Sequence, residues 1–158
     1  MSIRTKYETE LESVFNKLVK MCHDVELAIE KSVTALITRD DELARNVMRD
    51  DKNVDASERE IEQDCLKILL MEHPVATDFR EVSAALKMIT DLERIGDQAA
   101  DISEISLQFG KQKFIKKPEH IEMMAKIVIG MVKDGVHSFI NRDKTAAKAL
   151  DSRDDRVD

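Results

Sequence analysis

The sequence predicts an all-α protein made of tandem antiparallel three-helix bundles, of which the second is incomplete. Apolar residues recur at spacings of three and four over stretches of about 30 residues, the period of long helices packed side by side. Only four glycines and two prolines interrupt 158 residues. Alternating β-branched and aromatic runs bounded by turn residues, which would predict strands, do not occur.

Four helices follow from this rhythm. The first is expected over residues 7–37, where the apolar period is unbroken. Two acids open the second, over residues 40–73, and Pro74 ends it because proline cannot continue a helix. The third is expected over residues 75–109, and a lysine-rich connection then leads to the fourth, over residues 118–141. Short connections between long helices favour antiparallel neighbours.

An internal repeat supports the tandem arrangement. Ile37–Asp55 aligned with Ile140–Asp158, an offset of 103 residues, gives seven identities in nineteen positions. A repeat of this period predicts two similar bundles side by side. We therefore expect a first bundle over residues 1–110, a linker over 111–117 and a partial second bundle over 118–158, in a sequence shortened within its second repeat. Its unpaired apolar stripe predicts dimerisation, domain swapping or disorder, and among these we expect a homodimer.

Acids occupy the middle of one predicted contact line. Eight residues of the second helix follow a 4,3 spacing that should bury all of them against neighbouring helices, yet the central four are carboxylates. The line is Ala44, Met48, Asp51, Asp55, Glu58, Glu62, Cys65 and Leu69. Removing an unpaired carboxylate from water costs several kcal/mol, so this line requires arginines, a water-filled groove or a bound cation.

A second acidic step lies on the third helix. Glu93, Asp97 and Asp101 follow one another at four-residue steps and share one helix face. If the second and third helices pack together, their acids gather in one small volume. We therefore predict a metal site of Asp51 and Asp55 with Glu93, Asp97 and Asp101, and the repeat adds Asp154 and Asp158 as the start of a second set.

Other interpretations of these acids stay open. A run of charges often forms a solvated helix face, and Glu58 and Glu62 are assigned only a supporting or salt-bridging role. Arg80 and Arg94 are candidate salt-bridge partners of the acids. An all-carboxylate ligand set favours hard cations such as Mg²⁺, Mn²⁺ or Ca²⁺. The four scattered histidines are expected at surfaces or helix ends and not as ligands.

Composition excludes several function classes. The formal net charge of −7 argues against nucleic-acid binding, which needs a basic stripe. Residues 40–64 hold ten acids against four basic residues, so most of the imbalance belongs to the second helix. Cys22 and Cys65 lie among apolar residues, and we expect both in the core of a cytoplasmic protein with no membrane insertion.

Two segments of the third helix carry a resemblance to a known family. Pro74–Arg80 reads PVATDFR and Asp91–Asp97 reads DLERIGD, in this order on one helix. With these motifs the chain resembles the PhoU family of phosphate-uptake regulators over nearly its whole length. The family pattern often has asparagine at the position of Asp101 and leucine at that of Phe79.

The resemblance implies a fold, a cofactor and partners. It implies tandem three-helix bundles whose Glu/Asp-x-x-x-Asp motifs hold multinuclear clusters of iron or zinc, here through Asp51–Asp55 and Glu93–Asp97, with Asp154–Asp158 opening the second set. It further implies an adaptor that negatively regulates phosphate-starvation signalling. Its partners would be the phosphate ABC transporter ATPase and the phosphate-sensing histidine kinase.

Two rival functions come from other classes. A di-metal carboxylate enzyme of the ferritin-like kind also gathers acids within helices, but its Glu-x-x-His motif is missing, and the nearest approach is Asp134-x-x-His137. A purely structural helical scaffold is the second rival. Because the sequence holds no nucleophile with an adjacent base and no phosphate-binding glycine loop, we expect a protein that is not an enzyme.

Overall fold

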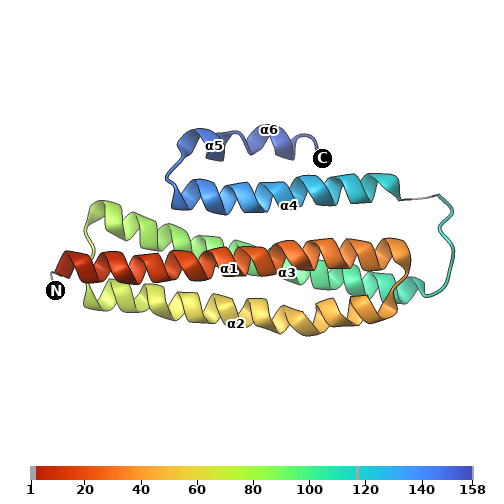
Figure 1. Ribbon diagram of the computed structural model, residues 1–158, viewed down its shortest axis with the longest axis horizontal. Helices are drawn as coiled ribbons and strands as arrows, with labels where there is room; N and C mark the ends of the chain where they lie inside the picture. The colour runs from red at the N-terminus through yellow and green to blue at the C-terminus, as the bar shows by residue number, and fades with distance from the viewer. Residues whose placement is uncertain (1–2, 117, 158) are drawn as a thin grey trace.

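The computed structural model describes residues 3–116 and 118–157, and every regular element within these ranges is a helix. Three long antiparallel helices form a bundle, α4 lies along it, and two short helices fold back over α4 (Figure 1). The helices are α1 (Ile3–Thr38), α2 (Asp41–Met71), α3 (Ala76–Phe109), α4 (Glu119–Ile140), α5 (Lys144–Lys148) and α6 (Asp151–Asp154).

The ends of the long helices follow from local chemistry. Asp40 caps α2 by accepting a hydrogen bond from the backbone N–H of Leu43 at 2.9 Å. Two acids in the first turn of α2 favour its positive dipole end. Helix α3 ends at Gly110, whose φ of 53° lies in the left-handed region that favours glycine. The four predicted helices are confirmed, with ends shifted by a few residues.

The core runs along the centre of the three-helix bundle. α1 buries the apolar line that its heptad rhythm predicted, and Leu18 and Met21 on it are fully buried. Helices α2 and α3 complete the core, and both cysteines lie within it as expected. The α2 and α3 members include Val54, Ile61, Cys65, Ile68, Val82, Ala85, Ile89, Leu92 and Ala99.

The rotation of α2 differs from the predicted one. The stripe of Val47, Val54, Ile61 and Ile68, with Ala44 and Cys65, faces the core. The acid-bearing line therefore lies at the edge of the interface with α3, and its acids at 51, 55 and 58 are half-buried. Met48 and Glu62, which the same line should bury, are exposed. Solvation of the carboxylates at this edge avoids the cost of full burial.

The internal repeat is visible in the backbone. Arg39 after α1 and Arg142 after α4, which are 103 positions apart, have left-handed φ values of 59° and 55°. Each is followed by an aspartate that caps the next helix, Asp40 for α2 and Asp143 for α5. Equivalent residues of the two repeats thus make equivalent turns. The second repeat then departs from the first, because α5 and α6 replace one long helix.

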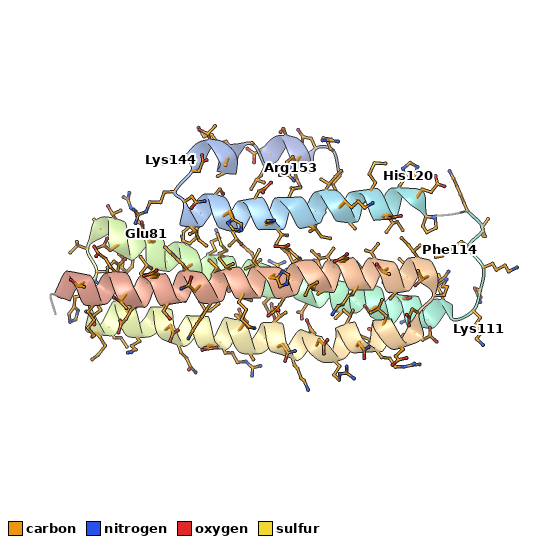
Figure 2. The ribbon with its side chains drawn as sticks, in the orientation of Figure 1. Glu81, Lys111, Phe114, His120, Lys144 and Arg153 are labelled. Carbon is orange, nitrogen blue, oxygen red and sulfur yellow. The ribbon has the colours of Figure 1, made fainter. Side chains whose placement is uncertain are left out.

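The two repeated arginines hold opposite ends of α3. Arg142 pairs with Glu81 near the start of α3, with Nη2 and Oε1 2.5 Å apart. Arg39 lies between two phenyl rings, 5.0 Å from the centroid of Phe109 and 3.7 Å from that of Phe114. Figure 2 shows Glu81 and Phe114 at opposite ends of the molecule. The Arg142 contact thus ties the second repeat to the start of α3, and the Arg39 contacts hold the end of α3 and the connection after it.

Helix α4 belongs to the same packed body as the first bundle. It packs along α1, where the rings of Phe15 and Phe139 meet edge to face at 5.6 Å, and its Val136 is part of the common core. The segment between α3 and α4 carries no helix in its described residues. Among the residues described, no helix combines the length and apolarity needed to cross a membrane.

Candidate metal centre

Helices α2 and α3 bring three aspartates together at the edge of their interface. Asp51 and Asp55 lie one turn apart on α2, and Asp97 comes from α3. One carboxylate oxygen of each lies within 4.8 Å of the others. The sequence predicted that the acids of these two helices would meet, and their placement confirms it. Two oxygens bound to one cation at 2.0–2.6 Å can be no more than about 5 Å apart, so this spacing fits a shared cation.

Three further acids adjoin this group. The pKa of Glu93 is raised, first by burial and then by the charges of Asp97 and Glu58. The charge of Asp101 in turn acts on Asp51. The charge of Glu58 thus acts on an acid of α3, which agrees with a supporting role for this residue. The acidic cluster comprises Asp51, Asp55, Glu58, Glu93, Asp97 and Asp101.

The pKa of Asp51 is the most strongly raised in the acidic cluster. Burial raises its pKa to about 6, and the charges of Asp55, Asp97 and Asp101 add to the shift. Both burial and neighbouring carboxylates disfavour the ionised form. A cation bound here would reverse the effect, because it favours ionised ligands and would displace the proton.

Basic side chains do not compensate the acidic cluster. In the part of the chain that the structure describes, no ion pair joins a lysine or arginine to any of its six acids. Lysines pair instead with acids outside it: Lys17, for example, lies 2.6 Å from both Glu60 and Asp64. Six oxygen-bearing groups without a basic partner form a donor set that fits a cation.

Other predicted site residues lie elsewhere. Asp154 is exposed on α6 and is not in the group with Asp51, and Asp158 lies outside the described residues. A turn at Leu150 separates α5 from α6, so the helix that carries Asp154 is short, and the second ligand set stays a prediction. The four histidines contribute nothing to the group of ligand atoms found among the described residues.

The predicted salt bridges of Arg80 and Arg94 are wrong. Both side chains are exposed on α3, and neither takes part in an ion pair within residues 5–116 and 118–157. Glu62, seven residues after Asp55 on α2, is also exposed. These three side chains point to solvent, where isolated charges need no partner.

Gly96 is the residue of this site that the sequence analysis missed. A Cβ at this position would lie 3.2 Å from Cγ1 of Val54 and 3.5 Å from Oδ1 of Asp51. The missing side chain therefore lets α2 and α3 approach closely beside the acidic cluster. A glycine within a helical pattern, directly before an acid of the DLERIGD motif, was the available signal.

Gly96→Leu should separate α2 from α3 and destabilise the protein by roughly 1–3 kcal/mol, the usual cost of overpacking. Urea denaturation followed by circular dichroism measures the change. Ala84→Leu adds the same side chain at an exposed position of α3 and should change the stability little. Equal stability of the two variants would show that Gly96 is not a point of close contact.

Asp51→Asn should stabilise the metal-free protein above pH 6. The folded-state pKa of Asp51, about 6, lies above the unfolded value near 4, so the free energy of unfolding falls as pH rises between these values. Because an asparagine side chain cannot ionise, the variant should exceed the wild type in free energy of unfolding by about 1–2 kcal/mol at pH 7, after allowance for solvent screening. Denaturation in chelator at pH 4, 5, 6 and 7 tests this. A gain at pH 7 no larger than that of Asp50→Asn would contradict it.

The comparisons with known proteins agree with this architecture. Residues 18–106 match the family model for the PhoU domain. A phosphate-specific transport system accessory protein PhoU homolog of Aquifex aeolicus is 36% identical over 149 residues, which is 94% of this chain and 67% of that protein. PhoU of Escherichia coli, also named a phosphate-specific transport system accessory protein, is 31% identical over 99% of this chain and 65% of its own length.

Solved structures share the fold. The crystal structure of PhoU from Pseudomonas aeruginosa superposes with a TM-score of 0.89 at 29% identity, covering 95% of this chain and 72% of that one. PhoU from Streptococcus pneumoniae superposes with a TM-score of 0.87 at 24% identity, covering 95% and 70%. The relatives of Aquifex aeolicus and Escherichia coli are named as accessory proteins of a transport system and not as enzymes, which agrees with the expectation of a protein that is not an enzyme. The chain belongs to the PhoU family.

Proposed function

We propose that this chain regulates phosphate uptake as a metal-binding adaptor. The observation that carries the proposal is the acidic cluster on α2 and α3 in a chain whose relatives are named accessory proteins of the phosphate-specific transport system. Six acids lacking a basic partner among the described residues suit a bound cation better than a passive surface. An adaptor acts by contact with other proteins, so the proposed function requires no catalytic site.

Asp51, Asp55 and Asp97 would hold the metal, with Glu58, Glu93 and Asp101 within reach of further ions. The bound ion would supply positive charge that neutralises the carboxylates and ties α2 to α3. We propose iron or zinc, as the family resemblance implies. Oxygen-only ligands equally suit Mg²⁺, Mn²⁺ or Ca²⁺, so metal analysis has to decide between these groups.

The proposed regulation is negative and takes place in the cytoplasm. The chain would restrain the phosphate ABC transporter through its ATPase and keep the phosphate-sensing histidine kinase from activating phosphate-starvation genes. A homodimer is part of the proposal. It is supported by the exposure of Ile121, Met123 and Met124 on α4 and by a groove of about 410 Å³ between α1 and α4.

Asp55→Asn/Asp97→Asn should remove most of the bound metal, because it takes one ligand charge from each helix. Elemental analysis of purified protein measures the metal, and circular dichroism checks that the helices persist. Asp50→Asn/Glu104→Gln makes the same charge change on the same helices at exposed positions outside the cluster. Equal metal content in the two variants, or none in the wild type, would leave a purely structural scaffold as the better explanation.

Deleting the gene should raise the activity of a phosphate-starvation reporter in cells grown with ample phosphate. The rise follows if the protein holds the kinase inactive under these conditions. A copy of the wild-type gene should return the reporter to its basal level. An unchanged reporter in the deletion strain would contradict the proposed regulation, whatever metal the protein binds.

A further inference from the structure

An apolar surface lies at the turn between α2 and α3. Its five large side chains have exposed fractions from 46% for Leu66 to 72% for Val75. The turn lies at the end of the three-helix bundle, beside the first turns of α1 (Figure 1). Exposed apolar side chains gathered in one place commonly mark an interaction site. We name this surface the hairpin tip: Leu66, Leu70, Met71, Val75 and Phe79.

Polar contacts brace the hairpin tip from behind. Lys6 pairs with Glu72, whose side chain is only 4% exposed, and Lys67 lies 3.5 Å from Glu10. The hydroxyl of Tyr7 donates a hydrogen bond to the carbonyl oxygen of Asp78 at 3.3 Å. The polar groups of the turn thus face α1, while its apolar side chains stay exposed. A surface ordered before binding loses little entropy when a partner docks.

The hairpin tip shares a face with the acidic cluster. On α3, Phe79, Leu86 and Glu93 follow at heptad spacing, which keeps them on one side of the helix. Fourteen residues separate Phe79 from Glu93, a rise of about 21 Å. One partner can therefore cover both regions, while changes at the hairpin tip lie too far away to disturb the cluster directly.

We propose that the hairpin tip docks into an apolar groove of a protein partner, with Leu70 and Phe79 as its anchors. This inference rests on the proposed adaptor function, and it names the surface that the adaptor uses. Each anchor is more than half exposed, at 71% and 51%. The two come from different helices, so a groove that receives the end of the hairpin contacts both.

The area argues against a second copy of the chain as the occupant. Five side chains with this exposure offer on the order of 500 Å² of apolar surface, whereas a stable interface takes about 800 Å² from each partner. Two convex helix ends meet only at their tips and cannot add the missing area. A concave partner can add it, because its walls also contact the flanks of α2 and α3.

Charge argues against a lipid surface. Exposed Lys67 and Arg80 flank the hairpin tip, but so do the acids Glu62 and Asp78. Each basic residue near an anionic bilayer contributes about 1 kcal/mol, and neighbouring acids offset this gain. A protein groove can instead place an opposite charge beside each residue of such a mixed rim.

The test compares Leu70→Ser/Phe79→Ser with Ile105→Ser/Ile115→Ser, which changes two exposed apolar residues toward the other end of the molecule. The probes are the purified phosphate-transporter ATPase and the cytoplasmic part of the phosphate-sensing kinase, titrated by calorimetry. We expect at least tenfold weaker binding of one probe for the hairpin-tip variant only. Metal content and helicity should match the wild type in both variants.

Several results would overturn the inference. One is equal affinity of both variants for each probe, and another is no binding of either probe by the wild type. Vesicles of phosphatidylglycerol and phosphatidylethanolamine that bind the wild type but not the hairpin-tip variant would identify a lipid surface instead. A dimer lost only in that variant, seen by sedimentation, would identify a second copy.

The deletion strain keeps this failure separate from failure of the proposed function. If the wild-type gene and the hairpin-tip variant both restore the basal reporter level, regulation stands and the hairpin tip is not its docking surface. If the deletion leaves the reporter unchanged, the proposed function itself fails. Restoration by the wild type and by Ile105→Ser/Ile115→Ser, but not by the hairpin-tip variant, agrees with docking through the tip.

Discussion

Close packing of α2 against α3 forces like charges together, and the properties of the site follow from this constraint. Val54 and its apolar neighbours fix the distance between the helices, and Gly96 lets that distance be short. The backbones of Asp51, Asp55 and Asp97 are then held near one another by the core. The fold therefore brings the three carboxylates within a few ångströms despite their repulsion.

Position at the edge of the interface keeps this arrangement tolerable. Full burial of unpaired carboxylates would cost several kcal/mol for each ion, which a bundle of this size could not offset. Half-burial raises the pKa of Asp51 to about 6, so that at neutral pH the carboxylate is still mostly ionised. The cluster can thus persist without a cation and remain ready to take one, which suits a centre that exchanges ions with solvent.

The sequence correctly predicted the helices and the proximity of the acids of α2 and α3. It predicted less well which residues of α2 are buried. Asp51 lies three residues before the buried Val54 and Glu58 four residues after it, so both are about 40–60° around α2 from the core stripe. Either line has a heptad spacing, and only packing against two helices at once selects between them. Because the acidic line and the apolar stripe are adjacent on α2, the acids lie near α3 whichever of the two faces the core.

The sequence repeat was not enough to predict where the second ligand set, which begins with Asp154, would lie. Asp154 repeats Asp51 by sequence, and the turns at Arg39 and Arg142 repeat in the structure. Local likeness of this kind says nothing about whether the following helix continues. The sequence repeat therefore predicts the turn before α5. It does not predict the break at Leu150, whose side chain lies beside Gly135 of α4.

The placement of the lysines separates the two edges of α2. Lys17 of α1 pairs with Glu60 and Asp64, and Lys6 pairs with Glu72, all on the side of α2 that faces α1. The acids on the side that faces α3 receive no such partner within the described chain. Helix α1 thus neutralises one edge of α2 and braces the hairpin tip, and the other edge keeps its charge. A cation and a protein partner would then approach the same α2–α3 face, where neither has to displace an existing ion pair.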